Sequence, residues 1–166
     1  FKELLKAWDE LVDTLLIFTK ANADMEGRLI NKLIDEFHIK NPEKTVVFTN
    51  MGQLLYLSTM KYVDAVIGNS SSGIIEAPSF KIGTINIGNR QKGRIRAQSV
   101  IDCEPNYEQI KDAFKILYSE EFQKKLKAAE NPYGNGEAST RIVKVLKNFD
   151  LREIGKDFYD LKEVIG

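Results

Sequence analysis

Apolar residues recur along the chain in two alternating patterns, which predict helices and short buried strands in turn. The opening segment places an apolar side chain every three or four positions, as an amphipathic helix does; these are Phe1, Leu4, Leu5, Trp8, Leu11, Val12 and Leu15. Short apolar runs without a polar break are typical of strands buried on both faces. We expect such strands at 15–18, 45–49, 64–68, 84–87 and 99–101.

Helical patterns separate these strands. Further helices are expected at 25–37, 54–60, 74–80, 107–118 and 120–129, with a last one whose apolar positions run from Ile142 to Phe149. Asp24 is a candidate N-cap, and Asn41-Pro42 ends the helix that follows it. Strands alternating with helices predict right-handed βαβ units and one parallel sheet covered on both faces. The fold class is therefore α/β in three layers, with one domain at 1–149 and an appended helix or tail at 150–166.

Composition narrows the possible functions. The 166 residues carry 24 Lys and Arg against 24 Asp and Glu, which argues against broad binding to nucleic acid or to an anionic membrane. One cysteine, Cys103, and one histidine, His38, exclude an internal disulfide and a His-rich metal site. A reducing cytoplasm is the expected compartment. The chain starts without Met in a helical pattern, so we expect it to be a piece of a longer protein.

The most polar turns of the chain follow the first four expected strands. They are 20–24, 50–52, 69–73 and 88–96. Because ligands of an open parallel sheet bind outside the carboxyl ends of its strands, we expect these loops to converge on a ligand.

The serine-rich segment Asn69–Gly73 is the first candidate site. Its hydroxyls and free backbone N–H groups at a helix N-terminus favour an anion such as phosphate. An ordinary serine N-cap explains the same residues equally well. The segment matches neither the Walker P-loop nor the GxGxxG pattern.

Two charged features lie beside this segment in the sequence. Glu76 is placed to accept hydrogen bonds from a ribose diol, or alternatively to act as a capping-box glutamate three residues after Gly73. Arg90, Lys92, Arg94 and Arg96 form a dense basic cluster that indicates a polyanion clamp, although at least two of them are expected only to face solvent. The residues alone thus predict an α/β domain that binds a phosphorylated ligand.

Two motifs taken together are more specific than either alone. The stretch GNSSSGIIEAP at 68–78, followed by INIGNRQKGR at 85–94, closely resembles the UDP-N-acetylglucosamine 2-epimerase family, especially its hydrolysing branch in sialic-acid-type sugar synthesis. The stretches TKANAD at 19–24 and NPYGNG at 131–136 agree with it. The resemblance covers about residues 1–149 and implies the Rossmann-like C-terminal half of a GT-B fold.

The resemblance also implies roles for individual residues. Ser70 and Ser71 would hold the diphosphate of UDP, Glu76 the ribose hydroxyls, and the backbone near Met51 the uracil, while Arg90 and Asn22 would approach the nucleotide. The family's acidic catalytic residues and its histidine lie outside this chain, so no catalytic residue is expected here. No cofactor or metal is implied.

The implied activity of the full-length enzyme is conversion of UDP-N-acetylglucosamine to UDP and free N-acetylmannosamine. This chain would be the UDP-binding part, inactive without its N-terminal half, and the full-length enzyme a homo-oligomer. Two alternatives stay open: the donor-binding half of a GT-B glycosyltransferase, and a non-enzymatic nucleotide-binding module.

Overall fold

The computed structural model describes residues 1–22 and 25–149. The predicted N-cap Asp24 and the predicted tail 150–166 lie outside the described residues. The chain divides into two compact units, Phe1–Tyr133 and a second that begins at Gly134. Because nothing tests the predicted 1–149 domain boundary, it stays a prediction, and each unit is described by itself.

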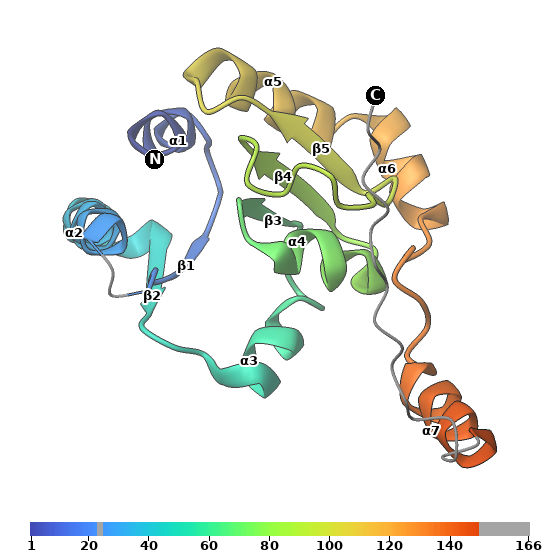
Figure 1. Cartoon of the computed structure of the whole chain (residues 1–166). Helices are drawn as coiled ribbons and strands as arrows, with labels where there is room; N and C mark the ends of the chain where they lie inside the picture. The colour runs from blue at the N-terminus through green and yellow to red at the C-terminus, as the bar shows by residue number, and fades with distance from the viewer. Residues whose placement is uncertain (23–24, 150–166) are drawn as a thin grey trace, which may run out of the picture. The chain divides into compact units, whose positions relative to one another are not determined.

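The first unit alternates strands and helices in the predicted order (Figure 1). Its strands are β1 (Leu16–Thr19), β2 (Thr45–Phe48), β3 (Ala65–Gly68), β4 (Gly83–Ile87) and β5 (Val100–Cys103). Its α-helices are α1 (Lys2–Asp9), α2 (Met25–Lys40), α3 (Gly52–Thr59), α4 (Ser71–Ile75), α5 (Tyr107–Leu117) and α6 (Glu120–Ala128). Two 3₁₀ turns, η1 (Pro42–Lys44) and η2 (Ala77–Phe80), complete it. The predicted α/β class, with a Rossmann-like arrangement of parallel strands and flanking helices, is confirmed.

The strands form two parallel sheets rather than the one sheet that was predicted. β1 pairs with β2, starting from Leu16 opposite Thr45, and β3, β4 and β5 pair in that order. Within the described residues, neither β1 nor β3 has a strand on its second edge. The described strands thus form two parallel sheets where one continuous sheet was expected, because each apolar run predicts a strand but does not identify its neighbour.

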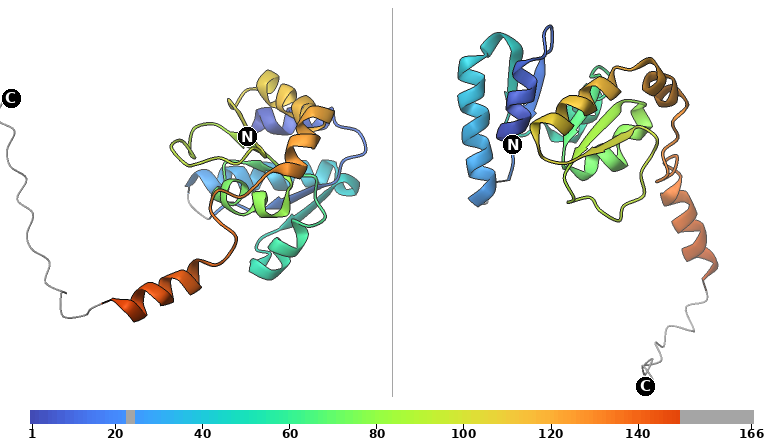
Figure 2. Two further views of the ribbon diagram at one scale, coloured as in Figure 1. Left: turned by 90° about the vertical axis from the view of Figure 1, so that its right-hand side faces the viewer. Right: turned by 90° about the horizontal axis from the view of Figure 1, so that it is seen from above.

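Helices cover both faces of these sheets. On one face, α1, α5 and α6 bury a core with β4 and β5 that includes Leu4, Ile85, Ile101, Phe114 and Leu117. On the same face, α1 and α2 cover β1 (Figure 2). The ring of Phe18 contacts those of Trp8 and Phe37 edge to face, with ring centroids 5.3 and 6.1 Å apart. On the other face of the three-stranded sheet, Met60 after α3 packs with Ala77 and Ile82. The helix α1 therefore spans both sheets.

The predicted opening helix is shorter than its apolar pattern. It ends at Asp9, and Asp13 has φ 54°, a left-handed conformation that a helix continuing to Leu15 could not contain. In the second unit, α7 (Ala138–Asn148) has an apolar face whose side chains Ile142, Val145 and Leu146 are exposed. No helix in the part of the chain that the structure describes is long and apolar enough to cross a bilayer.

Candidate functional site

The serine loop, residues 69–73, leaves β3 at its carboxyl end. Gly68 turns the chain with φ 142°, a conformation that disfavours a side chain. Ser70 is the N-cap of α4, and its Oγ accepts a hydrogen bond from the backbone N–H of Ser72 at 3.3 Å. The N-cap interpretation is thus confirmed. Because α4 has only five residues, its dipole is weak, and the loop's anion-binding groups are chiefly its hydroxyls and N–H groups.

A hydrogen-bonded chain of side chains reaches Glu76 from α3. The Tyr56 hydroxyl donates to Ser72 Oγ at 2.7 Å, and the Ser72 hydroxyl donates in turn to the Glu76 carboxylate. Burial raises the pKa of Tyr56 above its usual value, and the Glu76 charge adds to this rise against the opposing Ser72 hydrogen bond. The half-buried Glu76 carboxylate is therefore oriented by a chain of two hydroxyl groups, those of Ser72 and Tyr56.

The capping-box alternative for Glu76 is wrong. Glu76 lies at the carboxyl end of α4, where its backbone N–H donates to Ser72 O at 2.9 Å, whereas Ser70 caps the start of the helix. Its side chain accepts from a hydroxyl group rather than from the backbone N–H of an N-cap. The ribose role of this carboxylate is untested and stays a prediction.

The basic loop, residues 88–96, is held against the serine loop by an uncharged side chain. Gln91 is only 4% exposed, and its Nε2 donates to the backbone carbonyl of Asn69 at 2.7 Å. This contact joins the ends of β3 and β4 directly. Two of the four loops that were expected to converge are thus side by side.

The far end of the basic loop is fixed by a second polar contact. Arg96 Nε lies 2.7 Å from Asp102 Oδ2 as an ion pair, although its angle is unfavourable for an aligned hydrogen bond. Asp102 also accepts from Nδ2 of the buried Asn86 at 2.6 Å. Arg96 therefore has a structural partner, while Arg90, Lys92 and Arg94 are exposed and available to an anion.

A polar anchor that the sequence did not reveal supports the segment after Glu76. Asn131 Nδ2 donates to Ile75 O at 2.8 Å and lies 2.7 Å from Ser79 Oγ. The Tyr133 hydroxyl donates to Ile95 O in the basic loop at 3.0 Å. The NPY part of the NPYGNG stretch thus holds both the Glu76 segment and the basic loop in place.

The other predicted site residues lie farther along the carboxyl edge. Asn22 is exposed after β1, in the two-stranded sheet, and Met51 is half-buried immediately before α3. Ser70 and Arg90 are exposed, and Ser71 is half-buried. None of these placements tests the predicted UDP contacts.

His38 and Cys103, the remaining residues with reactive side chains, lie in surroundings that indicate a structural role. His38 Nδ1 lies 2.6 Å from Thr45 Oγ1 at the amino end of β2. The Thr45 hydroxyl donates its single proton to Asn41 O at 2.7 Å, so in the contact with Thr45 the imidazole N–H is the donor. Burial, then the charges of Asp102 and Glu104, raise the pKa of Cys103 to about 11, which keeps the thiol protonated. Within residues 1–22 and 25–149, no group of three or more His, Cys, Asp or Glu side chains is placed to hold a metal.

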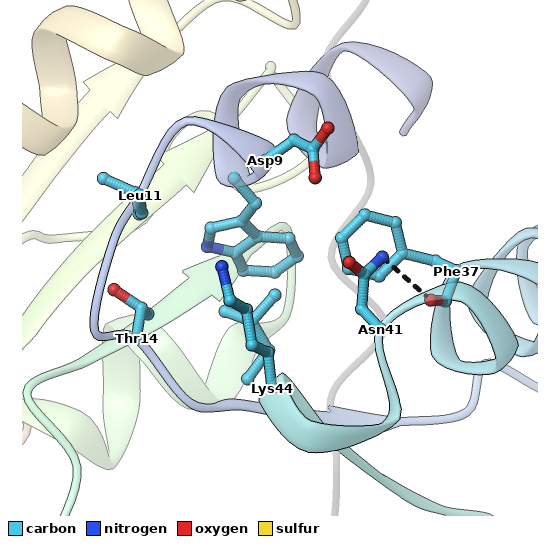
Figure 3. Close-up of a pocket in the computed structure, with 8 residues that line it drawn as sticks. Asp9, Leu11, Thr14, Phe37, Asn41 and Lys44 are labelled. Atoms are coloured by element: carbon cyan, nitrogen blue, oxygen red, sulfur yellow. Dashed lines mark hydrogen bonds between the residues drawn. The ribbon is translucent and has the colours of Figure 1, made fainter.

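Two of the cavities in the described part of the first unit border β1. The smaller, of about 10 Å³, lies at the amino ends of β1 and β2, where Asp9, Leu11, Thr14, Phe37, Asn41 and Lys44 surround it together with Trp8 and Leu16 (Figure 3). It has room for about one water molecule. The larger, of about 760 Å³, runs between β1 and β3.

The fold and site together define a Rossmann-like α/β domain with a polar site outside the carboxyl ends of parallel strands. The sequence model of the UDP-N-acetylglucosamine 2-epimerase family matches residues 1–147. The chain therefore belongs to the UDP-N-acetylglucosamine 2-epimerase family.

Curated relatives agree with this assignment. The chain is 51% identical over 162 residues to the GDP/UDP-N,N'-diacetylbacillosamine 2-epimerase (hydrolyzing) of Campylobacter jejuni, covering 96% of this chain and 42% of the relative. It is 34% identical over 136 residues to the UDP-N,N'-diacetylbacillosamine 2-epimerase (hydrolyzing) of Legionella pneumophila, covering 82% of this chain and 34% of the relative. The chain thus spans about two fifths or less of these relatives.

Solved structures show the same fold at lower identity. The UDP-GlcNAc 2-epimerase of Methanocaldococcus jannaschii, in complex with UDP-GlcNAc and UDP, superimposes with a TM-score of 0.64 at 23% identity, covering 89% of this chain and 41% of that one. The S. aureus MnaA–UDP co-structure gives 0.70 at 21% identity, covering 88% and 40%. These neighbours have the GT-B fold, in agreement with the predicted Rossmann-like class.

Proposed function

We propose that this chain is the UDP-binding part of a hydrolysing UDP-sugar 2-epimerase. The observation that carries the proposal is the Gln91–Asn69 hydrogen bond, which places the serine loop and the exposed cations of the basic loop side by side. Glu76 follows the serine loop, at the carboxyl end of the five-residue helix α4. Hydroxyls, cations and a carboxylate match the diphosphate and ribose of a nucleoside diphosphate.

The proposed contacts assign each group of the ligand to a residue. Ser70 and Ser71 hold the diphosphate and Arg90 neutralises its charge, while Glu76 accepts hydrogen bonds from the ribose hydroxyls. The backbone near Met51 contacts the uracil, and Asn22 approaches the nucleotide from the end of β1. The exposure of Ser70 and Arg90 supports these contacts because both side chains are free to reach a ligand.

The same contacts would serve the reaction. When UDP leaves the sugar in an elimination step, negative charge develops on the diphosphate. Hydroxyl, N–H and guanidinium groups at this position stabilise that charge more strongly in the transition state than in the bound substrate. The proposed role of this chain is therefore to bind the leaving group. The acid and base that act on the sugar come from polypeptide outside these residues, so the chain alone is expected to have no turnover.

The relatives support a sugar class for the whole enzyme. The names of the Campylobacter and Legionella relatives give N,N'-diacetylbacillosamine as the epimerised sugar, linked to GDP or UDP in the first name and to UDP in the second. We infer a UDP-linked 2-acetamido sugar as substrate, with UDP and the free, C2-inverted sugar as products. The family membership favours this reaction over the glycosyltransferase alternative.

Calorimetric titration with UDP and ADP tests the binding role. UDP is expected to bind the chain more tightly than ADP, and Glu76→Gln to weaken UDP binding by about 1–3 kcal/mol, the range for hydrogen bonds to a charged group. Ser72→Ala is the matched control, because it removes a donor to Glu76 and leaves the carboxylate in place. It should lower the melting temperature with a smaller effect on UDP affinity. ADP binding as tight as UDP binding would refute the proposal.

A further inference from the structure

The end of the basic loop is held by one guanidinium group that contacts two elements at once. Nη1 of Arg96 donates to Arg94 O within the loop at 2.9 Å, and Nε of Arg96 lies 2.7 Å from Asp102 Oδ2 on β5. The planar fork of an arginine can serve two acceptors in this way, whereas a lysine ammonium is a compact charge on a flexible stem. Arg96 is therefore a non-covalent cross-link between the loop and the sheet, and only 29% of its side chain is exposed.

Asp102 is itself fixed by the neighbouring strand. The strands β4 and β5 lie side by side, and Asn86 of β4 pairs with Asp102 of β5 in the parallel register (Figure 1). Nδ2 of Asn86 donates to Asp102 Oδ1 at 2.6 Å, and Asn86 is only 1% exposed. Each carboxylate oxygen of Asp102 thus has a partner, Asn86 in the sheet and Arg96 in the loop. A buried residue of β4 therefore determines, through Asp102, where Arg96 lies.

The backbone of Arg94 is held on both sides by these contacts. Its N–H donates to Gln91 O at 3.3 Å, and its carbonyl accepts from Arg96. The side chain of Gln91 is in turn bonded to the end of β3, so Arg94 is connected to both β3 and β5. Arg90 and Lys92 flank Gln91, and all three cationic side chains are exposed. The placement of the exposed cations thus depends on the Arg96 cross-link.

We propose that Arg96, Asp102 and Asn86 are positioning residues that hold the cations of the basic loop in place for a diphosphate, and that Arg96 is not itself a ligand of that diphosphate. The inference rests on the proposed function, because it takes the ligand of the loop to be a nucleoside diphosphate. It narrows the basic cluster from four cations to three, Arg90, Lys92 and Arg94. A loop that is already ordered loses less conformational entropy when the ligand binds, so the cross-link raises affinity.

Neutralising Asp102 separates positioning from simple electrostatics by the sign of the effect. A carboxylate near the site repels an anionic ligand, so the loss of its charge alone should strengthen UDP binding slightly. In Asp102→Asn the amide oxygen can still accept from Asn86, but the amide NH2 then faces the Arg96 guanidinium, donor against donor. Arg96 is released, and the loop loses its attachment to β5. The positioning role therefore predicts weaker UDP binding from the removal of a negative charge.

The size of the loss follows from how exposed the contact is. Residues that orient the ligands of a bound ion typically change its affinity by about 10- to 100-fold. Because 49% of the Asp102 side chain is exposed, the effect should lie at the low end of this range. We expect Asp102→Asn to weaken UDP binding about tenfold.

Two further variants serve as controls. Glu104→Gln removes the same charge directly after β5, where the exposed Glu104 bonds to Gln109 of α5 through its backbone N–H. It should leave UDP binding unchanged or slightly stronger. Arg96→Lys keeps the positive charge but cannot reproduce both contacts of the guanidinium, so it should weaken UDP binding nearly as much as Asp102→Asn does. A diphosphate ligand that needed only the charge at position 96 would be retained by the lysine.

NMR titration of the 166-residue chain and the three variants with UDP and with uridine is the test. Both Asp102→Asn and Arg96→Lys should lower the affinity for UDP about tenfold and leave that for uridine unchanged, because uridine lacks the diphosphate. Their melting temperatures show that each affinity refers to folded protein. UDP binding by Asp102→Asn as tight as that of the unchanged chain or tighter, near-normal UDP binding by Arg96→Lys, equal losses for UDP and uridine, or an equal loss in Glu104→Gln would each overturn the inference. Failure of the unchanged chain to bind UDP would instead refute the proposed function, and this inference with it.

Discussion

Replacing Gly73 by alanine is expected to disturb the serine loop through one identified contact. A Cβ added at Gly73 would lie 2.6 Å from the methyl carbon Cγ2 of Thr84 on β4, and 3.6 Å from Cγ1 of Val66. The Thr84 side chain is buried, and its hydroxyl donates to Gly73 O at 2.7 Å. Thr84 cannot turn away without losing that hydrogen bond, so α4 must move away from the sheet.

Two opposing terms set the size of the effect. Overpacking a well-filled site costs about 1–3 kcal/mol. Alanine is favoured over glycine inside a helix by about 1 kcal/mol, a gain that a five-residue helix such as α4 realises only in part. The clash therefore dominates, and Gly73→Ala should lower the free energy of unfolding by about 1–2 kcal/mol.

The second variant, Thr84→Ser, removes the clashing methyl and keeps the hydroxyl. By itself it should cost about 1 kcal/mol, the value of one buried methyl group. In its background, Gly73→Ala should be neutral or slightly stabilising, so the two substitutions are coupled by about 1–3 kcal/mol.

Urea unfolding followed by the fluorescence of Trp8, the single tryptophan, measures all four proteins. UDP titration of each should show weaker binding in Gly73→Ala and recovery in the double variant, because the loop returns to its position. An equal cost of Gly73→Ala in both backgrounds would refute the contact as the cause.

Three further predictions concern the surroundings of the site. Gln91→Leu removes the donor to Asn69 O, so it should lower unfolding free energy by about 1 kcal/mol and weaken UDP binding severalfold, whereas Gln98→Leu at an exposed position of the same region should change neither. Because the pKa of Cys103 is raised to about 11 from 9.0, iodoacetamide at pH 8 should alkylate the folded protein about 100-fold more slowly than the urea-unfolded chain; equal rates would contradict the shift. The raised pKa of Tyr56 means that the folded state keeps the phenolic proton longer than the unfolded state does, so this stabilising contribution is complete below about pH 10 and is lost as pH rises above it. Unfolding midpoints measured above pH 10 should accordingly fall less steeply for Tyr56→Phe than for the unchanged protein.

Local sequence patterns were sufficient to place the strands but not to pair them. Runs such as 45–49 and 84–87 are apolar and β-branched, and the structure has β2 and β4 there. Pairing depends on which edges meet in space, and no periodicity within a run records this. The division into two sheets therefore could not be predicted from the sequence, nor could the left-handed conformation of Asp13 after the opening helix.

The sequence predicted site features that depend on neighbouring residues, but not those that depend on contacts between residues far apart in the chain. Ser70 as a cap follows from residue type and position alone. Gln91 was missed because its partner Asn69 is 22 residues away, and Asn131 because its partner Ile75 is 56 residues away. One available signal was that Gln91 is an amide within a run of arginines and lysines, a composition that a purely solvent-facing loop does not require.

Tyr56 connects helix α3 to the proposed ligand site. Its hydroxyl donates to Ser72, which in turn donates to Glu76. This chain of hydrogen bonds restricts the orientation of the Glu76 carboxylate before a ligand arrives. Ordering a binding group in advance lowers the entropy that the ligand must remove, so the ordering of α3 and nucleotide binding should reinforce each other. Thermodynamic linkage makes this reciprocal: UDP bound at Glu76 should also stabilise α3, by the same factor.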